Sequence, residues 1–71
     1  METTDECVEL KAQEALALSP LLALRRLDVH HNEDRLVITG RVATFYQKQQ
    51  AQELVRNVAE GLHVVNEVEV T

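Results

Sequence analysis

Side-chain character repeats at two different spacings along this chain, and the switches between them constrain the fold more than any other feature. In 27–31, 36–42 and 64–70 the pattern repeats every second residue, which is typical of a half-buried strand. In 8–16 and 51–62 apolar residues recur every three to four positions, which is typical of an amphipathic helix. The sequence therefore predicts the order helix, strand, strand, helix, strand.

The first helix is expected to start at Thr4 or Asp5, either of which can serve as its N-cap. Its buried stripe would consist of Val8, Ala12, Ala15 and Leu16. Ser19-Pro20 should end this helix, because a residue before proline avoids helical backbone angles. Residues 21–24 are expected to add another helical turn, with Pro20 at its first position.

A polar, turn-like segment, 31–34, separates the first two strands, so we expect these strands to form a β-hairpin. Gly40 lies inside the second strand. A glycine there often marks a bulge or the close approach of another element. We expect a helix to lie across it.

The second helix is predicted to open at Thr44, because Thr44 and Gln47 have the spacing of a capping box. Its apolar stripe would consist of Ala51, Leu54, Val55, Val58 and Leu62. Gly61 is placed to be the left-handed C′ residue after this helix. In the last strand Glu67 and Glu69 would form a polar face, alternating with Val68 and Val70.

A right-handed crossover should make the last strand parallel to the second, which would then be central. Both helices must lie on one face to bury their stripes. The predicted fold class is α+β, a two-layer αββαβ sandwich with two helices packed on one face of a three-stranded mixed sheet. We expect a flexible N-terminus, 1–5, and a single domain, 6–71.

Length and composition restrict the function classes. A chain of 71 residues, 45% of them hydrophobic, is one ordinary globular domain. Its longest apolar stretches are only four residues, far below the ~20 that span a bilayer, and 1–10 lacks a secretory apolar region. We expect a cytoplasmic location if the chain is complete, and a periplasmic or envelope location if it belongs to a longer protein.

The charge distribution argues against a general nucleic-acid binder. The formal net charge is −5, whereas phosphate contacts need Lys and Arg. Residues 25–56 nevertheless carry six bases and four acids. The middle of the chain is therefore mildly basic between acidic ends.

Two glycines and a closing valine pattern resemble a known family. The spacing of Leu36-x-Ile38-x-Gly40-x-Val42, Thr44, Ala51 and Gly61-Leu62-x-x-Val65-Asn66-x-Val68-x-Val70 is similar to that of the BON domain (bacterial OsmY and nodulation) over about residues 6–71. The resemblance implies an αββαβ fold and a non-catalytic binding module. It also implies a role at membranes or envelopes, such as phospholipid association, osmotic-stress protection or the sensing of a small ligand or ion.

Clusters of polar residues do not add a catalytic or metal site. His30 and His31 lie near Glu33 and Asp34, but neighbouring strand residues point to opposite faces. Cys7 stands between Glu6 and Glu9, which disfavour a reactive thiolate, so we expect it to be a small apolar residue. We expect no enzyme activity, no catalytic residue, no metal and no cofactor.

The candidate binding residues lie in the basic middle of the chain. Phe45-Tyr46 beside Lys48 could anchor at a lipid interface or pack in the core, and we expect one of the two aromatics to face the core. The start of the second helix, Thr44 to Gln47, could also attract an anion. The predicted ligand- or lipid-binding residues are Arg35, Arg41, Phe45, Tyr46 and Lys48, and the predicted structural residues are Gly40, Thr44 and Gly61.

Two functions remain open at this point. The first is a binding module for a phospholipid surface or a small polar ligand. The alternative is a protein–protein interaction or self-association module, because the first and last strands would expose unpaired edges. We expect a monomer or weak homo-oligomer, no nucleic-acid partner and no transmembrane segment.

Overall fold

The structure, a computed structural model, describes residues 4–59 and 61–71, with side chains from residue 8 onward. The elements in chain order are α1 (Thr4–Ala17), the 3₁₀ helix η1 (Leu22–Arg26), β1 (Asp28–Asn32), β2 (Arg35–Thr39), β3 (Arg41–Val42), α2 (Phe45–Val58), β4 (His63–Asn66) and β5 (Glu69–Val70). The side chain of Cys7, for which we expected a small apolar role, lies outside the described part.

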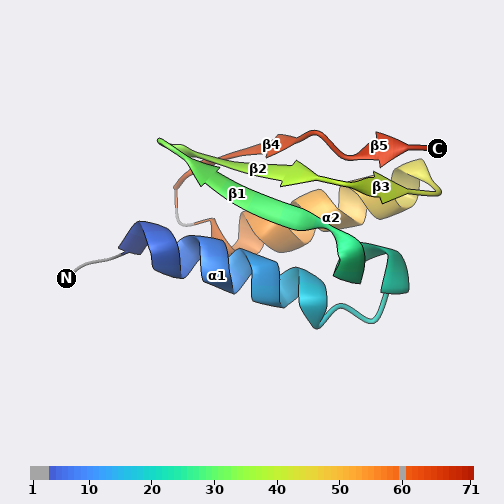
Figure 1. Ribbon diagram of the computed structural model, residues 1–71, viewed down its shortest axis with the longest axis horizontal. Coiled ribbons are helices and arrows are strands. Elements are labelled where there is room, and N and C mark those ends of the chain that lie inside the picture. The colour runs from blue at the N-terminus through green and yellow to red at the C-terminus, as the bar shows by residue number, and fades with distance from the viewer. Residues whose placement is uncertain (1–3, 60) are drawn as a thin grey trace.

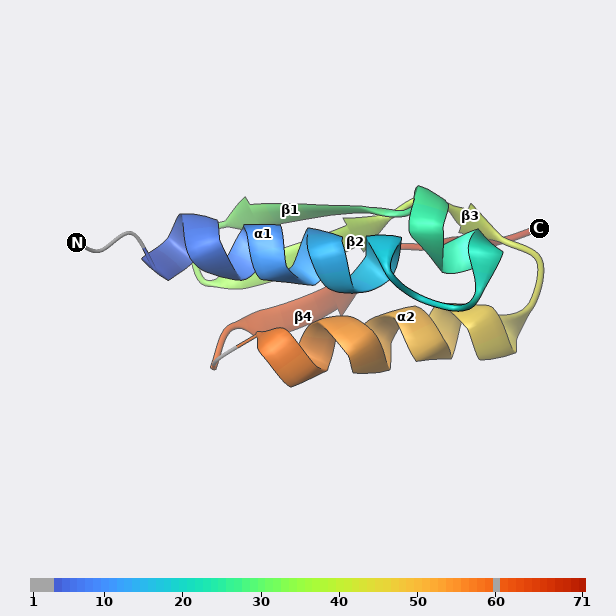
Figure 2. The same cartoon turned by 90° about the horizontal axis from the view of Figure 1, so that it is seen from below.

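The main sheet has the strand order β1-β2-β4. β1 is antiparallel to β2, with Val29 opposite Ile38, and β4 is parallel to β2, with Leu36 opposite Val64. Figures 1 and 2 show α1 and α2 side by side on the same face of this sheet. The predicted two-layer α+β fold, with β2 central in a mixed sheet, is therefore confirmed.

The second and last predicted strands are each divided in two. β3 and β5 form a separate parallel pair, but backbone hydrogen bonds continue across the division. The Glu67 N–H donates to the Ile38 carbonyl oxygen, and the Glu69 N–H donates to the Gly40 carbonyl oxygen, both over 2.9 Å. The two strands therefore bend together, at the point where Gly40 takes a φ of 134°.

The core lies between the sheet and the two helices. Its buried side chains are Val8, Ala12, Leu16, Leu24, Leu27, Val29, Leu36, Ile38, Val42, Ala51, Val55, Ala59 and Val68. In α2 the predicted stripe is confirmed up to Val58, with Leu54 and Val58 partly buried against this core. Leu62, predicted as its last member, is also partly buried there but lies beyond the helix, after the C-cap Ala59. Val70, which the strand pattern placed with the apolar face, is instead 43% exposed.

Two details of the first helical region differ from the prediction. α1 already includes Thr4 and Asp5, so neither is its N-cap, and the preceding position lies outside the described residues. The turn expected over 21–24 is η1, whose N-cap is the extended Leu21. Pro20 therefore precedes the element. The Ser19 hydroxyl accepts a hydrogen bond from the Leu21 N–H over 3.1 Å, an interaction typical of a turn around Pro20 rather than of a helix that starts there.

The prediction that a helix lies across Gly40 is wrong. The segment that crosses Gly40 is the junction between η1 and β1. A Cβ atom at Gly40 would lie 2.5 Å from Cδ2 of Leu27, which is only 1% exposed. Gly40 is therefore needed both for its backbone angle and for its missing side chain.

The ends of the hairpin and of α2 also shift slightly. Asn32 pairs with Arg35, so the turn shortens to Glu33 and Asp34, and Glu33 has a φ of 58°. The C-cap of α2 is Ala59, so the C′ position is residue 60, which lies outside the described residues. Gly61, the predicted C′ residue, lies one position further on and has a φ of 91°.

Candidate functional site

The start of α2 is fixed by the predicted capping box, which is confirmed. Thr44 is extended, and its Oγ1 accepts a hydrogen bond from the Gln47 N–H over 3.1 Å. The Gln47 Oε1 accepts from the N–H groups of Ala43 and Thr44 over 2.9 and 3.3 Å. These local bonds hold the first turn of α2 in a defined orientation. The backbone N–H of Gln47, which could have bound an anion, already donates to Thr44.

Both aromatic residues of this turn point outward. Phe45 is 68% exposed and Tyr46 is 64% exposed, so the expectation that one of them faces the core is wrong. The helical period explains the result, because extending the buried stripe back from Ala51 by three and four residues reaches Lys48 and Gln47. Those two residues are the half-buried ones.

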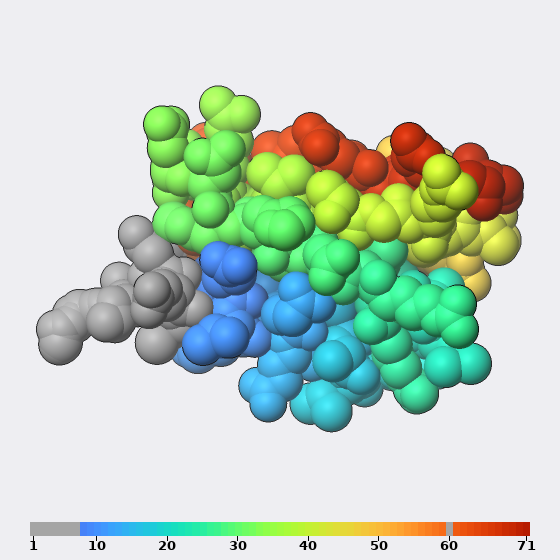
Figure 3. Space-filling model, in the orientation of Figure 1, coloured from blue at the N-terminus to red at the C-terminus, as the bar shows by residue number. Residues whose placement is uncertain are grey.

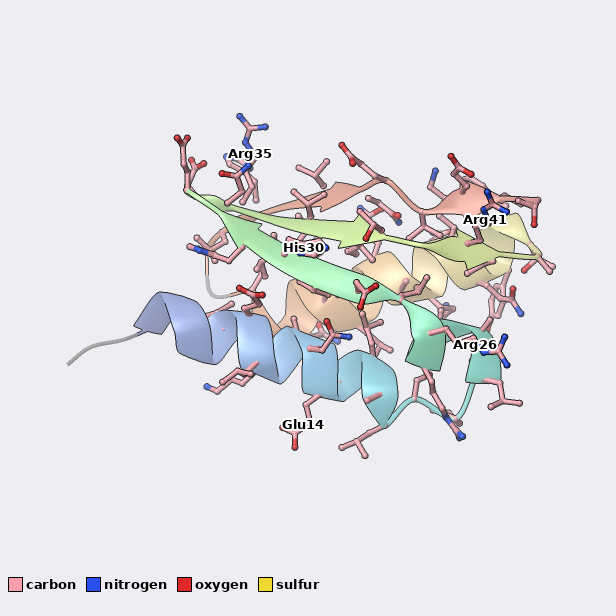
Figure 4. All side chains as sticks on the ribbon, viewed as in Figure 1. Glu14, Arg26, His30, Arg35 and Arg41 are labelled. Atoms are coloured by element: carbon pink, nitrogen blue, oxygen red, sulfur yellow. The ribbon has the colours of Figure 1, made fainter. Side chains whose placement is uncertain are left out.

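A cleft of about 350 Å³ lies where η1, β3 and the start of α2 meet. Its lining residues are Leu22, Ala23, Arg26, Arg41, Val42, Ala43, Gln47 and Thr71. The lining contains two arginines and no Asp or Glu. Figure 4 shows Arg26 and Arg41 at the same end of the molecule. We call the surface formed by Leu22, Arg26, Arg41, Phe45 and Tyr46 the η1–α2 end.

The structure separates the predicted binding residues into two groups. Arg41, Phe45, Tyr46 and Lys48 lie on β3 and the first turn of α2. Arg35 lies at the hairpin, near the other end of the sheet (Figure 4), with its Nε 4.0 Å from the Asp34 carboxylate. The η1–α2 end therefore includes Arg41, Phe45 and Tyr46 of the predicted set, but neither Arg35 nor Lys48.

Arg41 forms an exposed ion pair across the β3–β5 ribbon. Its Nε lies 3.6 Å from Oε1 of Glu69, and the two side chains are 76% and 69% exposed. A pair this exposed adds little stability because water and salt screen it. The guanidinium therefore remains accessible from the cleft side.

Sequence reasoning missed two members of this surface. Leu22 is 67% exposed and belongs to an apolar run for which only a helical turn was predicted. Arg26 follows that run as the second of two adjacent arginines. A basic pair directly after the leucine-rich run was the available signal, but only the fold shows that Arg26 and Arg41 line the same cleft.

Two polar clamps, also missed, hold the elements around the site. Gln13 on α1 donates from Nε2 to the Leu27 carbonyl oxygen over 2.8 Å and accepts from the Val29 N–H over 3.0 Å. Asn66 donates from Nδ2 to the Lys48 carbonyl oxygen over 2.9 Å and accepts from the Val68 N–H over 3.1 Å. The first clamp fixes α1 to β1, and the second fixes α2 to the break between β4 and β5.

The acidic and histidine side chains are dispersed. Within residues 4–59 and 61–71, no group of three or more His, Cys, Asp and Glu residues is arranged to hold a metal ion. His30 is exposed whereas its neighbour His31 is half-buried, as expected for residues on opposite faces of β1. None of the described helices is both long and apolar enough to cross a bilayer.

Two helices on one face of a mixed sheet, in the chain order αββαβ with a cleft at one end, place this chain among small two-layer α+β domains. The BON domain family matches residues 4–71, and the chain therefore belongs to the BON domain family. BON domains are generally non-catalytic binding modules and are associated with phospholipid binding and osmotic stress. Among curated proteins, none matches the chain.

Proposed function

We propose that this chain is a non-catalytic module that associates with anionic phospholipid surfaces through the η1–α2 end. The observation that carries the proposal is the pair of adjacent exposed aromatics, Phe45 and Tyr46, on the helical turn whose Gln47 lines a cleft together with two arginines. Aromatic rings favour the headgroup level of a bilayer, where an apolar body and a polar tip are both satisfied. Basic side chains nearby attract anionic lipid.

The magnitudes indicate that both parts of the surface are needed. Each arginine near an anionic membrane contributes about 1 kcal/mol, so Arg26 and Arg41 alone would give only a weak attraction against a net charge of −5. Contact of Phe45, Tyr46 and Leu22 with the interface adds an apolar contribution that salt does not screen. We therefore expect weak, reversible and partly salt-sensitive binding.

The other end of the molecule supports an end-on orientation. In Figure 3 the hairpin around Glu33 and Asp34 and the segment of η1 lie at opposite ends of the long axis. An anionic surface repels the acidic hairpin tip and attracts the η1–α2 end. Residues 6–71 would then act as one module with a single membrane-facing end.

Co-sedimentation with vesicles tests this function. The wild-type chain is expected to bind phosphatidylglycerol vesicles at low salt, and Phe45→Ser should weaken that binding severalfold. Leu10→Ser is the matched control, because Leu10 is also 68% exposed but lies on the outer side of α1. The proposal fails if the wild type stays in the supernatant, or if Phe45→Ser binds no worse than Leu10→Ser.

A second function, self-association or binding to another protein, is favoured by a different observation. Leu10 and Leu18 are 68% and 76% exposed on α1, and β1 and β4 are the edges of the main sheet, which are natural templates for pairing. Sedimentation velocity over a range of concentrations measures this. A sedimentation coefficient that stays at the monomer value at millimolar concentration contradicts self-association.

A further inference from the structure

We propose that the cleft at the η1–α2 end binds a phosphate group between Arg26 and Arg41. If the phosphate is that of a lipid headgroup, the inference rests on the membrane association proposed above. If the phosphate is a soluble phosphate or phosphate monoester, the inference does not depend on membrane association. Either source presents the same chemistry, a tetrahedral anion with several acceptor oxygens.

The composition of the cleft favours an anion. Its walls come from three elements, it has a volume of about 350 Å³, and the charged side chains that line it are those of Arg26 and Arg41. Guanidinium groups present paired donors whose geometry matches phosphate oxygens. Both arginines are exposed, so each side chain can swing inward when a ligand arrives.

The two arginines are available, in contrast to their neighbour. Arg25 donates from Nε to the Ser19 carbonyl oxygen over 2.7 Å and does not line the cleft. Arg26 has no ion pair with another residue in the described ranges. The Nε of Arg41 lies 3.6 Å from Oε1 of Glu69, which is longer than a hydrogen bond, so this pair does not fix the exposed guanidinium in place.

A core contact brings together the two chain segments that carry the arginines. Leu27 packs against the backbone of Gly40, where no Cβ intervenes. Arg26 directly precedes Leu27, and Arg41 directly follows Gly40. The close approach of these two segments therefore brings both cations to the lining of one cleft, independently of the charges themselves.

An NMR titration with inorganic phosphate at constant ionic strength tests the inference. Phosphate is expected to shift the amide resonances of Ala23, Ala43 and Gln47, whereas added chloride is not. The double substitution R26Q/R41Q should weaken phosphate binding about tenfold or more, because it removes two charge-assisted interactions. R35Q/R56Q is the matched control, since it removes the same charge from exposed arginines outside the cleft.

The outcomes separate this inference from the proposed function. Phosphate shifts at the cleft without any vesicle binding would support the site with a soluble ligand and defeat membrane association. A different outcome would overturn the site and leave membrane association standing. In that outcome R26Q/R41Q and R35Q/R56Q weaken vesicle binding equally, and phosphate causes no shifts at the cleft. A wild-type-like spectrum of each variant shows that it is folded.

Discussion

Gly40 sets how closely the segment before β1 approaches the bend between β2 and β3. Its φ of 134° is one that residues with a side chain rarely adopt. The space for a Cβ atom is already filled by Leu27. Backbone angle and packing therefore demand glycine for two independent reasons.

Gly40→Ala is expected to lower the free energy of unfolding by roughly 2–4 kcal/mol, from backbone strain plus overpacking. Gly61→Ala is the control, because Gly61 also has a positive φ, 91°, but a Cβ there would meet nothing within 4 Å. That variant should lose only about 1 kcal/mol. Urea denaturation followed by circular dichroism compares them, and equal losses would contradict the packing argument.

Asn66 joins α2 to the strand break through both ends of its amide. Asn66→Ala is expected to cost about 1–3 kcal/mol, because it leaves the Lys48 carbonyl and the Val68 N–H without this partner. Gln52→Ala removes only the longer 3.3 Å contact to Asn66 and should cost less. Urea midpoints measure both, and a smaller loss for Asn66→Ala than for Gln52→Ala would show that the clamp is unimportant.

At this scale, the sequence predicts interactions whose partners are close along the chain. Thr44 and Gln47 are three residues apart, so the capping box could be predicted. Gln13 and Asn66 bind partners 14 to 18 residues away, which no local pattern shows. Phe45 is a different case: the period of α2 placed it outward, but the absence of other aromatics suggested a core role that aliphatic side chains in fact fill.

The helix α2 carries its exposed aromatics on a turn that is stabilised locally. Thr44→Ala is expected to destabilise the protein by about 1 kcal/mol, because it removes the acceptor of the Gln47 N–H. Thr44→Ser keeps a hydroxyl and should be nearly neutral.

Thermal denaturation followed by circular dichroism measures these two variants. In a double-mutant cycle, Gln47→Ala should cost less in the Thr44→Ala background than in the wild type, since the two residues form one box. Strict additivity would mean that the two hydrogen bonds act independently.

The order and type of the main elements follow from periodicity, but their boundaries do not. The segment after Ser19 has too few residues to distinguish an α-helical turn from the 3₁₀ helix η1. The pattern of 36–42 keeps its period of two through Gly40, so it does not show that the strand divides there. The backbone hydrogen bonds between the two strands also continue past Gly40, so the division is only a change in strand direction.

The described elements share one core, with buried residues from α1, η1, β1, β2, β3 and α2 in a single cluster. We expect one cooperative unfolding transition. Amide resonances of α1 and β2, followed in the same urea series, should disappear at the same midpoint. If the α1 resonances disappeared at a lower urea concentration than those of β2, the Gln13 clamp and the buried stripe of α1 would not couple this helix to the sheet.

At the level of the whole molecule, handedness and patterning were enough to predict the topology. A right-handed crossover through α2 fixed β4 beside β2, and two apolar stripes required both helices on one face. The cleft could not be predicted in the same way. It depends on Arg26 and Arg41, which are fifteen positions apart in the sequence and line the same cleft only in the folded chain.

Salt should act unequally on the geometry and on the charge of this site. The separation of the walls is set by a leucine pressed against bare backbone, and dissolved ions do not screen such a contact. Concentrated electrolyte would therefore weaken the attraction for an anion while leaving the opening the same width. On transfer from low to high salt, the protein would therefore keep the shape of its cleft and lose only affinity for the anion.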